Sequence, residues 1–367
     1  MALLQQSEEC SLLGPDEHSE TGLEKSPGFP NRQQKSSPFK CLFYLCVGLS
    51  LLALGISIGV LIKSYGVPSS GPGVPATSVS GCTTPSTRRE WRSLSTAEKH
   101  DYLQAVVCLR EQPSRLGLNQ SLYDDFPWVH VRIGEYSHHS AAFLAWHRYF
   151  IQTYERALQE QCGYQGHLTY WNWVLDWEDI TQAPVWHEKD GFGTNGDPSV
   201  GEAIMGGHCV VDGPFARLEV PYIDKRPKPH CLSRGFESGG QLAKHGSWFR
   251  PEAMEKLQRG NDYNAFNLGL EDGPHIAIPR SIRGDFSMFT APYDPVFFLH
   301  HTQLDRLWWT WQQRDPQNRK WQYRGLAAHN FTDPASLTDI ILMGGLAPDI
   351  KVAEIIDTES DLLCYIY

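Results

Sequence analysis

Apolar residues form one unbroken run near the start of this chain. Residues 41–62 read CLFYLCVGLSLLALGISIGVLI and carry no charge. A run of this length is typical of a helix that crosses a membrane. The basic residues Arg32, Lys35 and Lys40 precede the run closely, and only Lys63 follows it closely. Because positive charge favours the cytosolic side, the pattern predicts a type II single-pass membrane protein. Its larger part is then expected in the secretory lumen or outside the cell.

Two later segments repeat apolar residues at helical spacing. In residues 140–163, one stripe at i, i+4, i+8 and i+11 consists of Phe143, His147, Ile151 and Tyr154. In residues 294–316, three side chains share one helical face: His301, Asp305 and Trp308. Residues 181–260 are rich in Gly and Pro and show little periodicity, which indicates long ordered loops. The expected fold class is mainly α.

Composition divides the chain into four parts. Residues 1–40 are polar and predict a disordered cytosolic tail, which the membrane helix at 41–62 follows. Residues 63–81 are rich in Ser, Gly and Pro and predict a flexible stalk. No second linker interrupts residues 82–367, so these predict one lumenal domain. The net charge of −10, without a basic stripe, argues against nucleic acid as a partner.

Two kinds of residue agree with a secretory location. Asn119 and Asn330 each begin an Asn-x-Ser/Thr sequon, which is glycosylated only in the secretory pathway. Residues 82–367 contain an even number of cysteines, as is typical of disulfide-bonded domains in an oxidising compartment. The sequence leaves their pairing open; they are Cys82, Cys108, Cys162, Cys209, Cys231 and Cys364.

Histidines gather around the two helical segments. A single histidine on an apolar face is more often a packed core residue than a ligand, but two clusters favour a metal centre. Imidazole suits copper, zinc, iron and nickel, and the chain lacks the Cys-x-x-Cys and His-Glu-x-x-His patterns that support zinc. The clustered residues are His130, His138, His139, His147, His275, His300 and His301.

Residues 123–173 resemble the copper A half of tyrosinases, especially fungal ones, and DPVFFLHHTQLDRLWWTW resembles the copper B half. The terminal Cys364-Tyr-Ile-Tyr367 is similar to the tyrosine motif that closes the fungal core. The resemblance covers essentially all of residues 82–367. It implies a four-helix-bundle core with two coppers, each held by three histidines, and dioxygen bound between them.

Site residues can be carried over by position. The resemblance implies His130, His138 and His147 as copper A ligands, with His139 as a neighbour. It implies His275 and His301 as copper B ligands.

Three further residues lie close to these ligands in the sequence. Glu271 matches the acid that holds an ordered water near the substrate phenol. His300 would point to another side of the helix from His301. Asp305, one turn beyond His301, would orient imidazoles, or else pair with Arg306 or Arg314 on the helix surface.

The remaining copper B ligand is expected four residues after His275, where the chain has Pro279. Proline offers no nitrogen to a metal. Three interpretations remain open. A replacement such as His245 or His329 completes the site, copper B is weak or absent, or the domain is a non-catalytic, membrane-tethered binding partner.

The function implied by the resemblance is oxidation of phenols by dioxygen, as ortho-hydroxylation, catechol oxidation or both. No covering domain follows the tyrosine motif in this sequence, which predicts a pocket open to bulky phenols. Tyrosyl residues of a natural-product precursor peptide would suit such a pocket, as in a short fungal enzyme of secondary metabolism.

Overall fold

A computed structural model describes residues 82–216 and 218–367 of the chain. The predicted tail, membrane helix and stalk, at 1–40, 41–62 and 63–81, lie outside the described residues. Within the described part, no helix combines the length and the hydrophobicity needed to cross a membrane.

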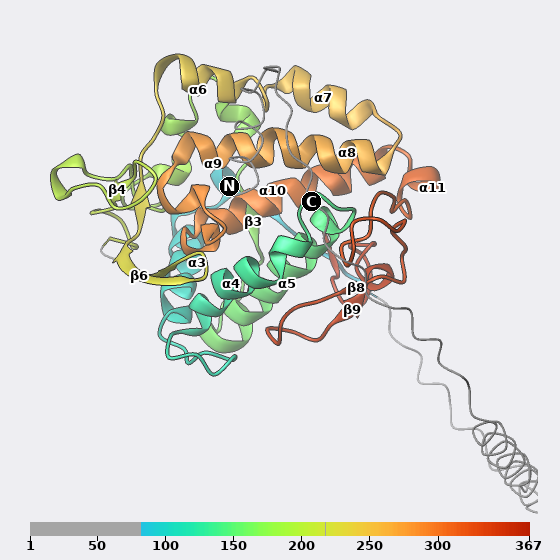
Figure 1. Cartoon of the computed structure of the whole chain (residues 1–367), viewed down its shortest axis with the longest axis horizontal. Coiled ribbons are helices and arrows are strands. Elements are labelled where there is room, and N and C mark those ends of the chain that lie inside the picture. The colour runs from blue at the N-terminus through green and yellow to red at the C-terminus, as the bar shows by residue number, and fades with distance from the viewer. Residues whose placement is uncertain (1–81, 217) are drawn as a thin grey trace, which may run out of the picture. The chain divides into compact units, whose positions relative to one another are not determined.

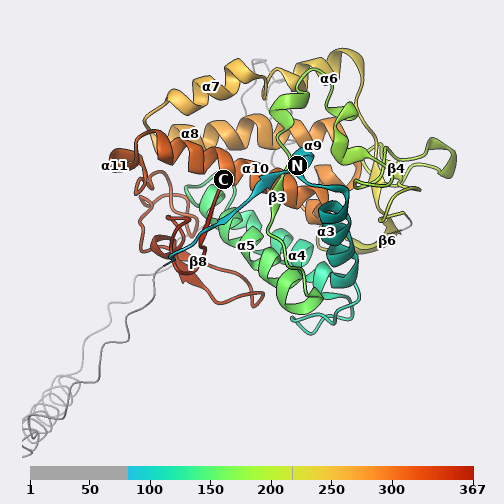
Figure 2. The ribbon, with the colours of Figure 1, turned by 180° about the vertical axis from the view of Figure 1, so that it is seen from behind.

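Helices dominate the described part, which confirms the mainly α class. Figures 1 and 2 show α10 running through the middle, with α8 and α9 on one side and α4 and α5 on the other. A π-type turn, Glu271–His275, joins α8 to α9. The α-helices are α3 (Thr96–Leu109), α4 (Leu122–Arg132), α5 (Ala142–Cys162), α6 (Gly239–Gly246), α7 (Pro251–Arg259), α8 (Tyr263–Leu270), α9 (Ile276–Ile282), α10 (Val296–Arg314) and α11 (Pro316–Arg319).

The strands are short and form two-stranded pairs throughout the described residues. β1 pairs in parallel with β10, which brings the two ends of the described part together. β5 and β6 form the longest pair, an antiparallel hairpin. The strands are β1 (Ser86–Thr87), β2 (Arg89–Glu90), β3 (Thr169–Tyr170), β4 (His208–Cys209), β5 (Glu219–Ile223), β6 (Arg226–Cys231), β7 (Ser233–Arg234), β8 (Ile340–Ile341), β9 (Ile350–Lys351) and β10 (Tyr365–Ile366).

Local sequence signals set one end of each of the two helices that carry His130 and His147. Ser121 and Asp124 form a capping box at the start of α4, which satisfies backbone N–H groups that the helix leaves unpaired. α5 ends at Gly163, whose φ of 67° is the left-handed conformation that glycine adopts without a steric penalty.

Aromatic packing fixes α5 against α10. The Tyr154 and Phe298 rings stack with centroids 3.5 Å apart and planes 4° apart. Phe126 and Phe150 surround them, and all four side chains are fully buried. Such pairs contribute about 0.5–1.5 kcal/mol each beyond the area they bury. This contact lies two turns from His147 and one from His301, so it sets the distance between the two histidine segments.

The expectation of long loops over residues 181–260 is incomplete. This segment contains α6, α7 and the β5–β6 hairpin. α6 begins with Gly239 and Gly240, which are poor helix formers, and each helix is too short to show a repeated apolar stripe. Pro251 at the first turn of α7 was the one available start signal.

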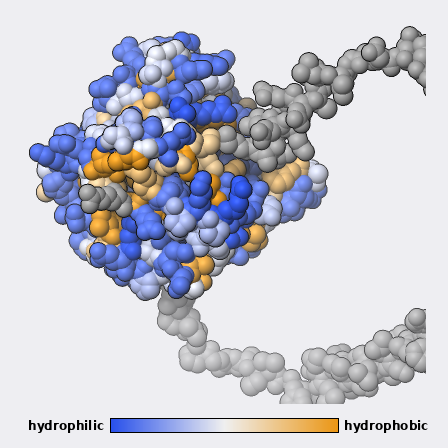
Figure 3. Space-filling model, turned by 60° about the vertical axis from the view of Figure 1, so that its left-hand side comes forward, coloured by the Kyte–Doolittle hydropathy of each residue, from blue (hydrophilic) through white to orange (hydrophobic). Residues whose placement is uncertain are grey.

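The six cysteines of the described part, whose pairing the sequence does not predict, form three disulfides. Cys108–Cys162 joins the ends of α3 and α5, and Cys82–Cys364 links the two ends of the described part. Cys209–Cys231 braces the β5–β6 hairpin. Figure 3 shows one face of the surface, on which apolar patches lie among hydrophilic side chains.

Candidate metal centre

Three buried histidines converge on one point between α4 and α5. His130 lies in the last turn of α4, His138 between the helices, and His147 in α5. One donor atom from each lies within 4.8 Å of the other two, and the Nε2 atoms of His147 and His130 are 3.4 Å apart. We call these three residues the first triad.

Backbone carbonyls orient each imidazole of the first triad. The Nδ1–H groups donate to the carbonyls of Phe289 (2.6 Å), Gly134 (2.7 Å) and Phe143 (2.7 Å), in the order His130, His138, His147. With Nδ1 protonated, each Nε2 carries a free lone pair. Such partners fix the tautomer and the ring orientation of metal-binding histidines.

Burial keeps these imidazoles neutral. It lowers the pKa of His130 to about 3 and of His138 to about 4, and the charge of a neighbouring histidine contributes to each shift, His138 to the first and His139 to the second. Burial also places the pKa of His147 well below its usual range. Neutral imidazole is the form that binds a metal, so the first triad is ready to bind one at neutral pH.

A second group of histidines faces the first triad. His301 stacks on His147, with ring centroids 4.2 Å apart and planes 14° apart. His275, at the end of the π-type turn, lies 5.5 Å from His138 between ring centroids. The structure thus brings together all five histidines that the sequence assigned to copper.

The suggested replacements for the ligand at Pro279 have other contacts among the described residues. The His329 side chain is 62% exposed and pairs with Asp333. His245 contacts the Ser281 hydroxyl at 3.3 Å. Ser281 lies two residues after Pro279 in α9, so it points to nearly the opposite side of that helix. The interpretation that His245 or His329 completes copper B therefore stays a prediction that no contact among the described residues supports.

Glu271 lies in the π-type turn with 1% of its surface exposed. Its Oε1 accepts a hydrogen bond of 2.7 Å from the His139 backbone N–H. Its Oε2 is buried without a hydrogen-bond partner among the described residues. Burial raises the pKa of this carboxyl to about 8, so it is protonated at neutral pH when no cation is nearby.

We expect Glu271→Gln to stabilise the copper-free protein more at high pH than at low pH. Between about pH 4.5 and pH 8 the folded state keeps a proton that the unfolded state has released, so this carboxyl favours folding less as pH rises. Glutamine does not titrate. The melting temperature of the variant minus that of the wild type should therefore increase from about pH 5 to about pH 9. A difference independent of pH would contradict the raised pKa.

The expected role of Asp305 in orienting imidazoles is wrong. Its carboxylate accepts hydrogen bonds from Arg148 (2.5 Å), Tyr365 (2.5 Å) and Tyr367 (2.6 Å), and Arg88 lies at 3.5 Å. None of these partners is a histidine, and Asp305 is too deeply buried to pair on the helix surface. It holds α10 to α5 and to the end of the chain.

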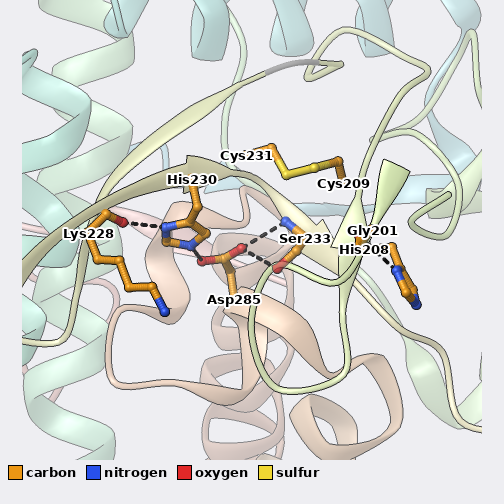
Figure 4. Close-up of a disulfide and its surroundings, with 8 residues drawn as sticks. All are labelled: Gly201, His208, Cys209, Lys228, His230, Cys231, Ser233 and Asp285. Carbon is orange, nitrogen blue, oxygen red and sulfur yellow. Dashed lines mark hydrogen bonds and ion pairs between the residues drawn. A yellow bond between two sulfur atoms is a disulfide. The ribbon is translucent and has the colours of Figure 1, made fainter. Parts of the chain in front are cut away.

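No signal in the sequence marks the segment that supplies the Phe289 carbonyl. Asp285 fixes this segment to β6 and β7, as Figure 4 shows. It accepts hydrogen bonds from Ser233 N (2.8 Å) and Ser233 Oγ (2.7 Å), and its other oxygen lies 2.8 Å from His230 Nε2. Asp285 is fully buried. Nothing in the spacing of these residues predicts that they meet.

Residues 120–314 match the common central domain of tyrosinase. The chain belongs to the tyrosinase family, whose fold and donor set make this a copper centre and the protein a copper oxidoreductase. This confirms the resemblance found in the sequence. The first triad suits copper because it presents three neutral imidazoles with free Nε2 lone pairs.

Among individual relatives, the chain is 45% identical to tyrosinase-like protein phomQ1 of Diaporthe leptostromiformis, over 78% of each chain. It is 42% identical to tyrosinase ustQ of Aspergillus flavus, over 78% of this chain and 80% of the relative. A solved polyphenol oxidase from Thermothelomyces thermophila, a mutant form, matches with a TM-score of 0.67 and 30% identity. That match covers 77% of this chain and 88% of the other.

Proposed function

We propose that the protein oxidises phenols with dioxygen at a copper pair between α5 and α10. His130, His138 and His147 would hold copper A, and His275 and His301 would contribute to copper B. The observation that carries the proposal is the face-to-face placement of the two histidine groups, with His147 stacked on His301. Bound copper would supply the redox chemistry that passes electrons from the phenol to dioxygen.

The side chains around the histidines would hold the centre rigid and exclude water. Phe143 lies against His147 and His275, with ring centroids 4.9 Å and 4.7 Å away. Phe297 lies 4.1 Å from His301 on the same measure. Both phenylalanines are buried, so they form an apolar wall on the inner side of the histidines. A low-polarity wall strengthens the electrostatic interactions inside the site.

Exposed rings on the outer side support an aromatic substrate. Phe289 is 38% exposed and lies 5.5 Å from His138 between ring centroids. Trp248 is 53% exposed and packs beside Gly273 in the π-type turn. These rings can stack on a phenol, and Glu271 Oε2, which has no partner among the described residues, would hydrogen-bond the phenol hydroxyl or an ordered water. We extend the proposal to tyrosyl residues of a natural-product precursor peptide.

Oxygen uptake by the copper-loaded protein tests the reaction and the substrate class. The assay compares a tyrosine-containing peptide, the same peptide with phenylalanine instead, and a catechol. Uptake with the tyrosine peptide supports ortho-hydroxylation, and uptake with the catechol alone restricts the reaction to catechol oxidation. Oxygen uptake with neither substrate supports the alternative that the domain is a non-catalytic binding partner. The one observation that favours this alternative is the proline at position 279.

We further propose the four-part organisation expected from the sequence, with residues 82–367 on the lumenal or extracellular side. The three disulfides suit an oxidising compartment. Both sequon asparagines, Asn119 and Asn330, are exposed and thus accessible to glycosylation. The apolar run at 41–62 would be the anchor.

Removal of residues 1–63 should release the protein from membranes. The full chain should sediment with the membrane fraction and remain there in high salt, because burial of the apolar run does not depend on charge. The truncated chain should stay in the supernatant. Equal sedimentation of the two forms would show that 41–62 is not the anchor.

A further inference from the structure

His300 is a buried imidazole without a hydrogen-bond partner. It has no exposed surface, and neither ring nitrogen is hydrogen-bonded within the described part of the chain. Trp173 and Phe286 flank the ring, with centroids 6.2 Å and 5.7 Å away. A polar group buried without a partner destabilises the fold, and such groups in native proteins usually have a partner such as an ion or a water.

His300 forms a second group of three histidines together with His275 and His301, and we call this group the second triad. Its ring spacing is similar to that of the first triad. Ring centroids of His275, His300 and His301 lie 5.9, 5.3 and 5.1 Å apart for the pairs 275–300, 275–301 and 300–301. The corresponding distances in the first triad are 5.4, 5.5 and 5.1 Å for 130–138, 130–147 and 138–147. The three rings of the second triad are therefore about as close together as those of the first.

The two triads differ in how their rings are held. Every Nδ1 of the first triad is fixed by a carbonyl, whereas His300 is free of hydrogen bonds among the described residues. Its ring lies 18° from parallel to that of His275, and the donor atoms of the second triad do not converge within 4.8 Å. Rotation about the side-chain bonds of His300 would break no hydrogen bond with the described residues.

We propose that His300 is the third ligand of copper B, in place of the histidine that Pro279 replaces. The proposal rests on the proposed function, since it requires the copper pair. The imidazole would come from α10, next to His301, instead of from α9 one turn after His275. Three neutral nitrogen donors would then serve each copper.

The test is the copper content of His300→Phe, measured by elemental analysis on protein loaded with copper and then desalted. Phenylalanine keeps the ring shape but removes both nitrogens. We expect two coppers per chain in the wild type and one in the variant. His245→Phe and His329→Phe are matched controls and should retain two. Electron paramagnetic resonance provides a second readout, because an isolated Cu(II) ion gives a signal that a coupled pair lacks.

Pro279→His separates a lost ligand from a damaged fold. Added to His300→Phe, it should restore two coppers per chain; added to the wild type, it should leave the number at two. Two coppers in His300→Phe would overturn the proposal. A wild type that holds one copper per chain, together with a Pro279→His variant that holds two, would also overturn the proposal. Two coppers in the wild type without phenol-dependent oxygen uptake would refute the proposed function and leave the ligand assignment intact.

Discussion

Replacement of His147 by alanine is expected to abolish phenol oxidation. Its Nε2 atom lies 3.4 Å from Nε2 of His130, and its ring stacks on His301. His147 therefore lies where the two histidine groups meet. Loss of residues that merely orient a ligand costs about 10–100-fold in affinity or activity, and loss of a ligand itself should exceed that range. The variant should retain at most one loosely held copper.

His139→Ala is the matched control. His139 is adjacent to His138, but its side chain is 67% exposed, so most activity should remain. Copper content and initial rates with one phenol, compared across the three proteins, test the assignment. Equal activity in His147→Ala and the wild type would show that copper A is not bound here. Melting of the copper-free proteins separates this outcome from a loss of folding.

Replacement of Asp305 by alanine is expected to cause the largest loss of stability. Its carboxylate pairs with the fully buried guanidinium of Arg148 and accepts hydrogen bonds from Tyr365 and Tyr367. Removal of one partner of a buried ion pair costs about 3–5 kcal/mol, because the other charge is left without compensation. Arg148 follows His147 in α5, so the damage should extend to copper binding.

Denaturant unfolding of the copper-free proteins measures this loss. Asp333→Ala is the control, because the Asp333 side chain is 64% exposed and pairs only with His329 among the ion pairs of the described residues. An exposed pair of this kind contributes less than about 1 kcal/mol. A shift in the unfolding midpoint no larger for Asp305→Ala than for Asp333→Ala would contradict the role given to the buried network.

Helical periodicity and histidine clustering sufficed to predict the two segments around His147 and His301. Both helices are buried on almost every side along most of their length, and their long apolar and aromatic sequences contain no Gly or Pro that would interrupt a helix. The conformation of Glu271–His275 is harder to predict from the sequence. It contains Pro274 and a kink at Gly273, yet it continues the helical path from α8 to α9. A proline and a glycine in the sequence indicate the end of a helix, and only the surrounding packing shows that the helical path continues here.

Partners distant in the chain could not be predicted from the sequence. Asp305 receives its hydrogen bonds from residues 60 to 217 positions away, so no local sequence pattern predicts them. The same holds for the Phe289 carbonyl, which contacts His130 across 159 residues. Neither feature has a characteristic residue spacing. Their identification required the tertiary fold.

The most direct measurement is oxygen uptake with a tyrosine-containing peptide before copper removal, after chelation, and after copper is restored. The protein should be the full chain, loaded with copper and freed of excess metal. We predict uptake that depends on the tyrosine, disappears with the copper and returns when copper is restored. Absence of phenol-dependent uptake from a folded chain that holds two coppers would contradict the assignment as a phenol oxidase.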